Sequence, residues 1–373
     1  MKTKVSFSEK KYQEIKVASI HGRYITNDHL EDFLHGHFED LIGLIKGSSV
    51  LKKDIYSITL GKGPIKILMW SQMYGNESTT TKAVLDLVNF LFKGDALAES
   101  YLSRCQIRII PILNPDGAEA YTRFNANEID LNRDAQDLSQ PESRFLRETY
   151  EAFQPDFCFN LHDQRTIFNV GTSEMPATVS FLAPAHDEER NTSASRALSM
   201  QLIAVMNKEL QTQIAGQVGR YDDTFNANCV GDAFQMFGTP TVLVEAGHFS
   251  GDYDREETRK YVFSALQKAI EVICDGKLSD QNISDYLNIP ENGKLFFDIL
   301  VKHAHLLNAR FKEDEQLGIL YKEILKNKAI SFQPYIEEKG NLNSKLGHLV
   351  LDLKNPSDLK KLKDTPVLYN LII

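Results

Sequence analysis

Polar side chains with useful chemistry directly follow several apolar runs of the chain. Four such groups come after runs that resemble buried strands: Tyr74-Gly75-Asn76-Glu77, Asn114-Pro115-Asp116-Gly117, His162-Asp163-Gln164 and Glu245-Ala246-Gly247. In open α/β sheets, functional groups gather at the carboxyl ends of strands. Carboxylate and imidazole donors suit a zinc ion with a bound water, and another carboxylate can act as base on that water. Glu77, His162 and Glu245 are therefore candidates for metal chemistry.

Each of these residues also has an ordinary structural interpretation. A single histidine at a strand end is most often a satisfied core residue, whereas burial of an unpaired glutamate is costly. The polar segment RFNANEIDLNRD at 123–134 would by itself suggest an ion-pair network on a surface loop. The recurrence of useful groups at four strand ends favours a functional site.

The elements that must position these groups alternate between strand and helix. Strand-like runs lie at 54–60, 65–73, 105–114, 157–162, 178–184 and 239–247. Helical patterns lie at 28–46, 78–92, 142–153, 193–211 and 255–274, and the Ser/Thr cluster at 78–81 is expected to cap the second of them. Strands that are apolar almost throughout predict an α/β fold, with a mixed, mostly parallel sheet covered by helices on both faces.

The composition changes after about residue 280. Short strand-like runs, joined by turns, replace the long helices there: FFDILV, LGILYKE, AISFQPYIEE, GHLVLDL and VLYNLII. This change predicts an α/β domain over 1–280 and a small β-rich domain over 281–373.

Length and charge exclude several classes of protein. The 373 residues carry a net charge of −9, which argues against a broad basic face for nucleic acid. No apolar run approaches the roughly 18 residues of a membrane span, and the start of the chain shows no apolar signal segment, so we expect a cytoplasmic protein. The four cysteines form no CxxC pair, which predicts free thiols.

Taken together, the motifs resemble the M14 zinc carboxypeptidases, which are carboxypeptidase A-like metallopeptidases. The runs SQMYGNESTTTKA, NPDG, RFNANEIDLNRD, NLHDQ and TVLVEAG follow that family in order and register over about residues 60–275. The resemblance implies a carboxypeptidase-like fold, one Zn²⁺ site, and a hydrolase that removes the C-terminal amino acid of a peptide.

The first metal ligand departs from the pattern of this family. The family uses His-x-x-Glu and a distant His, whereas here Tyr74 precedes the matching Glu77 and His162. Neutral imidazole binds zinc near pH 7, but a phenol has an ordinary pKa of about 10 and must lose its proton to bind well. We therefore expect Tyr74 to leave zinc weakly bound or absent. A tyrosinate–zinc bond is the less common alternative.

The resemblance also implies roles for residues around the metal. Glu245 matches the general base, and Arg123 matches the arginine that stabilises the oxyanion of the tetrahedral intermediate. Asp130 matches a carboxylate that orients the first ligand, and we expect it to accept a hydrogen bond from Tyr74.

Substrate-binding positions follow from the same resemblance. Asn132 and Arg133 match the pair that holds the terminal carboxylate, for which a guanidinium fork is well shaped. Tyr221 matches the mobile tyrosine that caps the substrate.

Three functional interpretations stay open at this point. The first is a metallocarboxypeptidase impaired by Tyr74. The second is an inactive relative that binds a peptide or a carboxylate, and the third is an N-acyl amino acid deacylase of the same superfamily. NPDG and the following Asn-Arg pair favour the carboxypeptidase branch. The expected partner is a peptide or a small carboxylate-bearing substrate, without nucleic acid or a membrane span.

Overall fold

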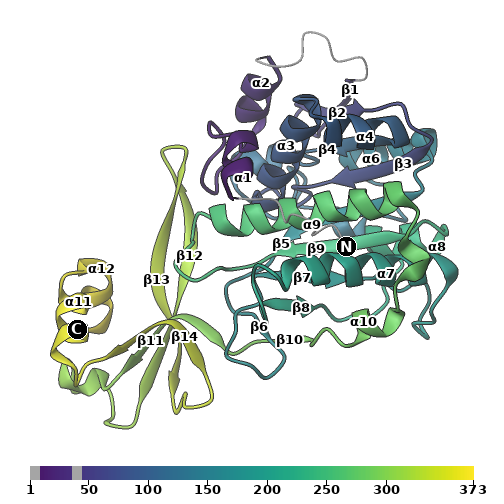
Figure 1. Ribbon diagram of the computed structural model, residues 1–373. Helices are drawn as coiled ribbons and strands as arrows, with labels where there is room; N and C mark the ends of the chain where they lie inside the picture. The colour runs from purple at the N-terminus through teal and green to yellow at the C-terminus, as the bar shows by residue number, and fades with distance from the viewer. Residues whose placement is uncertain (1–8, 36–43) are drawn as a thin grey trace.

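A computed structural model describes residues 9–35 and 44–373, and its centre is an eight-stranded sheet (Figure 1). The strand order is β1-β2-β4-β3-β5-β9-β7-β8. Their bounds are β1 Ile45–Ser48, β2 Asp54–Leu60, β3 Ile65–Trp70, β4 Cys105–Ile110, β5 Phe157–Asp163, β7 Val179–Leu182, β8 Val218–Arg220 and β9 Thr241–Ala246. The four central strands β4, β3, β5 and β9 are parallel, whereas β1–β2, β2–β4 and β7–β9 are antiparallel pairs. The predicted mixed α/β sheet is confirmed.

Helices cover both faces of this sheet. One face carries α1 (Glu9–Ile15), α3 (Thr79–Phe92), α4 (Ala96–Arg104), α7 (Ala194–Leu210) and α9 (Glu256–Asp275), and the other carries α6 (Pro141–Phe153) and α8 (Val230–Met236). In β3, Ile67 and Met69 belong to the first core while Leu68 and Trp70 belong to the second. Because successive side chains of a strand point to opposite faces, a strand buried on both faces must be apolar throughout.

Two predicted segments differ in the structure. The helix expected at 28–46 is the shorter α2 (Asn27–His35); residues 36–43 lie outside the described part of the chain, and residues 45–48 form β1. NPDG, expected as a turn, opens α5 (Pro115–Ala120). Asn114 Oδ1 accepts the N–H of Gly117 at 2.9 Å, and Pro115 occupies the first helical turn, where it needs no partner for its nitrogen.

A separate four-stranded sheet follows, in the order β13-β12-β11-β14. Its strands are β11 Phe296–Lys302, β12 Gln316–Lys326, β13 Ala329–Gly340 and β14 Leu346–Asp352, and α11 (Pro356–Lys363) and α12 (Pro366–Ile372) come after them. VLYNLII, predicted as a strand, is α12. Its buried Leu368 and Ile372 are four residues apart and lie on one helical face, which packs in the same core as Ile299 and Leu351. A short apolar run does not distinguish the two structures.

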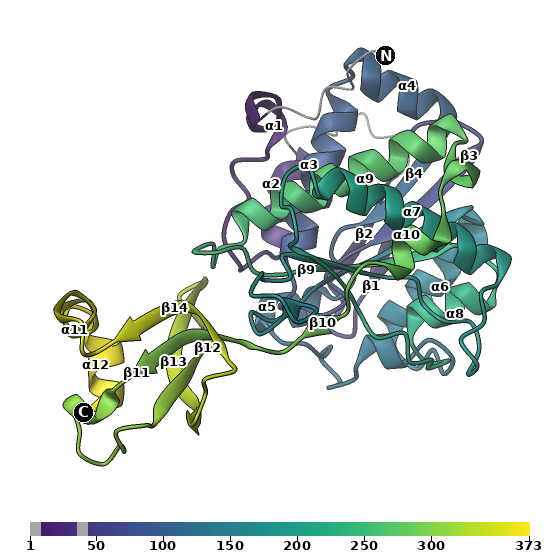
Figure 2. The same cartoon turned by 60° about the horizontal axis from the view of Figure 1, so that its bottom comes forward.

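The four-stranded sheet lies to one side of the larger body, and the β12–β13 hairpin extends from this sheet along the larger body (Figures 1 and 2). The segment between the two sheets belongs by its contacts to the larger body, since α10 (Ile283–Leu287) packs on α7 and β10 (Asn292–Gly293) pairs with β6 (Asn169–Val170). The division at residue 280 stays a prediction. Within the described ranges, no helix is both long and apolar enough to cross a membrane.

Candidate active site

Three neighbouring parallel strands bring the predicted groups to one edge of the large sheet. The loop after β3 carries Tyr74 and Glu77, β5 carries His162 near its end, and β9 carries Glu245. His162 and Glu245 are direct register partners across β5 and β9. Residues separated by up to 171 positions in sequence are thus neighbours.

Glu77 and His162 are in direct contact. Oε2 of Glu77 lies 2.9 Å from Nδ1 of His162 and accepts the backbone N–H of Asp163 at 3.0 Å. Both side chains are largely buried. Burial raises the pKa of the Glu77 carboxyl, and the hydrogen bond from His162 opposes that rise.

Asp163 fixes the start of α3 beside this pair. Its two carboxylate oxygens accept the N–H groups of Thr79 at 2.9 Å and Thr80 at 3.2 Å. The expected cap from the Ser/Thr cluster is wrong, because Ser78 makes no side-chain cap and donates its hydroxyl to the carbonyl of Arg23 instead. A carboxylate at a helix N-terminus satisfies free N–H groups and the helix dipole. The loop that carries Glu77 is therefore tied to the end of β5.

The same loop is held from its other side by a close backbone approach at Gly75. A Cβ atom at this position would lie 1.9 Å from the carbonyl carbon of Gly117 and 2.2 Å from the nitrogen of Ala118. Only glycine fits there. The NPDG element therefore has a structural role, in which it sets the backbone between positions 74 and 77.

Tyr74 is engaged by Arg123. Nη2 of Arg123 donates to the phenol oxygen at 2.6 Å, and the guanidinium carbon lies 3.6 Å from the ring centroid. The ring also lies 5.0 Å from that of His162. Burial raises the pKa of Tyr74 above its ordinary value, so the phenol is neutral near pH 7.

The hydrogen bond expected between Tyr74 and Asp130 does not occur among the described residues. Oδ2 of Asp130 accepts from Nη2 of Arg123 at 3.0 Å, and Arg123 in turn reaches Tyr74. The arginine has five N–H donors in a fork and bridges two acceptors, which spacing in the sequence does not reveal.

Asn132 and Arg133 form a short 3-10 turn after Asp130, whose Oδ1 caps the N–H of Asn132 at 2.9 Å. The side-chain oxygen of Asn132 accepts the N–H of Val230, at the start of α8, at 3.0 Å. Nη1 of Arg133 donates to the carbonyl of Asn132 at 2.7 Å and to Sγ of Cys229 at 3.1 Å. Arg133 is exposed and pairs with no carboxylate within 9–35 and 44–373. Its remaining donors can meet a carboxylate ligand.

Glu245 and Tyr221 interact electrostatically with each other and with Glu77. Burial, together with the negative charges of Glu77 and Asp163, raises the pKa of the Glu245 carboxyl well above its usual range. Burial and the charge of Glu245 also raise the pKa of Tyr221, which follows β8. A carboxyl with a raised pKa is suited to accept and release a proton near neutral pH.

The residues present do not complete the zinc site that the sequence resemblance implies. Glu77 and His162 supply two ordinary donors, and Nε2 of His162 is buried without a hydrogen-bond partner among the described residues. The third position holds a neutral phenol whose oxygen accepts from a cationic guanidinium. In the part of the chain that the structure describes, no cluster of three His, Cys, Asp or Glu side chains could hold a metal ion.

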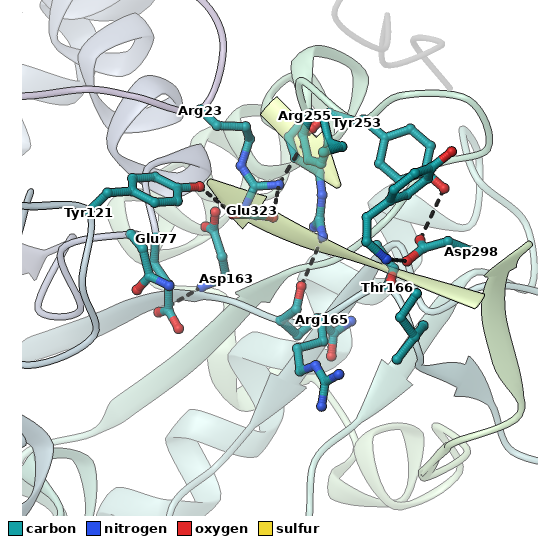
Figure 3. Close-up of a pocket in the computed structure, with 15 residues that line it drawn as sticks. Arg23, Glu77, Tyr121, Asp163, Arg165, Thr166, Tyr253, Arg255, Asp298 and Glu323 are labelled. Carbon is teal, nitrogen blue, oxygen red and sulfur yellow. Dashed lines mark hydrogen bonds and ion pairs between the residues drawn. The ribbon is translucent and has the colours of Figure 1, made fainter. Parts of the chain in front are cut away.

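Sequence reasoning missed a pocket of about 310 Å³ that adjoins Glu77 (Figure 3). It is lined by residues of the large body and by others from β11, β12 and β13, among them Arg23, Tyr121, Asp298 and Glu323. Glu323 of β12 pairs with Arg23 at 3.1 Å and accepts the hydroxyl of Tyr121. Arg23, Asp298 and Glu323 stand far from every motif, and Tyr121 lies between two motifs without belonging to either, so the sequence offered no signal for them.

Comparison with known proteins supports the family resemblance. Residues 32–212 match the model of the zinc carboxypeptidase family, Peptidase M14. This range contains every proposed site residue except Tyr221 and Glu245. Carboxypeptidase 2 of Trichophyton rubrum is 29% identical over 100 residues, covering 26% of this chain and 19% of that protein. Carboxypeptidase D of Mus musculus is 30% identical over 180 residues, covering 37% and 13%.

A solved structure shares the fold. The metallo-carboxypeptidase of Burkholderia cenocepacia superposes with a TM-score of 0.55 at 18% identity, covering 68% of this chain and 70% of that one. The chain spans about a fifth or less of the length of the two curated relatives. The resemblance to the M14 zinc carboxypeptidases is confirmed.

Proposed function

Because this chain is a relative of the M14 zinc carboxypeptidases, we propose that it is a hydrolase of the metallocarboxypeptidase type that binds the C-terminal end of a peptide and cleaves it slowly. Asn132 and Arg133 would hold the substrate carboxylate, whereas Tyr74 stands where the family resemblance implies a histidine ligand. The observation that carries the proposal is the contact of Arg123 with Tyr74 beside the Glu77–His162 pair.

The chain's own residues would divide the work as follows. Arg133 and the side-chain nitrogen Nδ2 of Asn132 keep N–H donors that no described residue occupies. These donors would bind the carboxylate of a substrate. Glu245 would hold or accept a proton, since burial and the neighbouring negative charges raise the pKa of its carboxyl well above its usual range. Arg123 is less available to a developing oxyanion than the family pattern implies, because Tyr74 and Asp130 both accept from it.

Replacement of the tyrosine tests the proposal directly. Loss of a partner that only orients a metal ligand costs about 10–100-fold in affinity, so the gain of a true ligand should be at least that large. We expect Tyr74→His to bind close to one equivalent of zinc and to hydrolyse a C-terminally free tripeptide at least about 100-fold faster. Zinc content by metal analysis and amino acid release by mass spectrometry are the measurements.

Tyr74→Phe is the matched control for this experiment, because it removes the hydroxyl without supplying a donor. It should match the unaltered chain in zinc content. If the unaltered chain already holds a full equivalent tightly and is as active as Tyr74→His, the interpretation of Tyr74 is wrong. If Tyr74→Phe loses zinc that the unaltered chain held, tyrosinate is a ligand.

A second candidate function is binding without cleavage. It is favoured by Arg133, which is exposed and forms no ion pair with a carboxylate of a described residue. A peptide with a free C-terminal carboxylate should then bind, and its C-terminally amidated form should bind at least about 10-fold more weakly. An N-acyl amino acid hydrolysed in preference to a tripeptide would instead indicate the deacylase branch. The cytoplasmic location stays a prediction.

A further inference from the structure

The pocket beside Glu77 has one wall of clustered aromatic rings. Tyr253 comes from the large body, Tyr321 from β12 and Phe332 from β13 (Figure 3). Ring centroids are 5.2 Å apart for Tyr253 and Tyr321, 5.3 Å for Tyr253 and Phe332, and 6.1 Å for Tyr321 and Phe332. We call these three residues the aromatic wall. All three are half-buried, so part of each side chain is exposed.

Asp298 of β11 holds the aromatic wall together across the two bodies. Its Oδ1 accepts the hydroxyl of Tyr253 at 3.0 Å, and its Oδ2 accepts the backbone N–H of Tyr321 at 2.8 Å. Asp298 is buried, so both bonds lie away from competing water. The wall is a fixed feature that requires the four-stranded sheet.

Most charged residues on the other side of the pocket already have partners, and the exposed Arg165 is the exception among the described residues. Glu323 pairs with Arg23, and Asp163 caps α3. Arg255, which is 1% exposed, donates to the carbonyls of Ala246 and Gln164. The aromatic wall is therefore the apolar surface of this pocket that is free for a ligand, and Arg165 is the charged lining residue whose donors no described residue occupies.

The position of the pocket relative to the site sets which part of a peptide reaches it. Glu77 belongs to its lining, whereas Arg123, Asn132 and Arg133 do not. With the terminal carboxylate at Arg133 and the last peptide bond at the Glu77–His162 pair, the preceding residue continues toward the pocket. This step rests on the proposed function.

We infer that the aromatic wall is a subsite for an aromatic side chain on the residue that precedes the C-terminal one. Rings that meet edge to face or at a tilt gain attraction beyond the burial of their area. The volume of about 310 Å³ lies at the lower end of small-molecule sites, which suits one large side chain and its backbone.

Two peptides that differ only at that residue test the inference on the full chain. Acetyl-Ala-Phe-Leu should bind about 3- to 10-fold more tightly than acetyl-Ala-Ala-Leu by isothermal titration calorimetry. Mass spectrometry after each titration shows whether the peptide is intact, and where it is cleaved the ratio of kcat/KM values replaces the ratio of affinities.

Variants assign the preference to the aromatic wall. Phe332→Ala should abolish the preference for the phenylalanine peptide and leave the affinity for the alanine peptide unchanged, and Phe332→Tyr should keep the preference. Phe237→Ala is the matched control, because Phe237 is 45% exposed at the end of α8 and lies outside the pocket. Its preference should equal that of the unaltered chain.

The outcomes separate this inference from the proposed function. Equal affinity of the unaltered chain for both peptides overturns the subsite alone. A preference that survives in folded Phe332→Ala, or that is lost in Phe332→Tyr, also overturns it. If neither peptide binds, the subsite and the proposed function are both wrong.

Discussion

The site has two halves that meet at Arg123, which bonds Tyr74 on one side and Asp130 on the other. The metal half consists of Tyr74, Glu77 and His162, and the anchor half consists of Asp130, Asn132 and Arg133. In the anchor half, Asp130 accepts the N–H of Asn132, the side-chain oxygen of Asn132 accepts the N–H of Val230, and Arg133 keeps N–H donors that no described carboxylate occupies. In the metal half, the phenol oxygen of Tyr74 accepts a hydrogen bond from Arg123, which also pairs with Asp130. Arg123 therefore links the two halves, because it donates to Tyr74 of one and to Asp130 of the other.

The largest effect should come from the base, once the metal half is restored. In Tyr74→His, a further Glu245→Gln change should lower peptide hydrolysis by about 10²–10⁴-fold, the usual contribution of a general base. Zinc content should not change, because Glu245 is not a donor in this interpretation. Hydrolysis that persists at the Tyr74→His rate would remove Glu245 from the mechanism.

The second largest expected effect is a pH-dependent difference in stability caused by Asp232. This residue belongs to α8, whose first residue, Val230, is bonded to Asn132 of the anchor half. Asp232 of α8 is buried, which raises the pKa of its carboxyl from 3.8 to about 7. The folded state therefore holds a proton that the unfolded state releases between these values, so stability falls as pH rises from about 4 to 7. Asp232→Asn cannot titrate. The stability of the unaltered chain relative to this variant should be roughly 2–3 kcal/mol greater at pH 5 than at pH 8 by urea unfolding.

This expectation has a clear opposite. A difference that does not change with pH, or that grows as pH rises, would show that Asp232 is ionised in the folded chain. The anchor half would then rest on a buried negative charge.

Arg133→Met tests the anchor half itself. A hydrogen bond to a charged group contributes about 1.5–3 kcal/mol, so the affinity for a peptide with a free carboxylate should fall roughly 10- to 100-fold. The affinity for the amidated peptide should stay the same, which separates the lost contact from a general disturbance. An equal loss for both peptides would place the carboxylate elsewhere.

Tyr74→Phe should have the smallest effect. It removes one acceptor of Arg123, which costs about 1 kcal/mol of stability in a urea unfolding experiment. Arg123 keeps Asp130 and the ring face, so the anchor half should bind peptides as before. A large loss of peptide affinity would mean that the two halves are coupled more strongly than their contacts indicate.

Much of the fold and of the site could be predicted because local pattern and burial agree there. β2 lies at the predicted residues 54–60, since Tyr56, Ile58 and Leu60 form one apolar face and the turn GKGP follows the strand. Glu77 and His162 could be paired because both follow strands of a parallel sheet, whose ends meet at one edge.

The remaining features depend on contacts between distant segments. The cap of α3 comes from Asp163, which is 84 residues from Thr79 in sequence, and the partner of Tyr74 comes from a loop 49 residues away. The aromatic wall combines Tyr253 with residues of a second sheet. Spacing in a single sequence carries no record of such pairings.

The approach of Gly75 to Gly117 has a consequence for how this protein can change. The close approach of Gly75 and Gly117, and not the ring of Tyr74, constrains the backbone next to position 74. Exchange of that ring for an imidazole therefore leaves the loop undisturbed. Under the proposed function, the side chain at position 74 alone would separate a receptor from a catalyst.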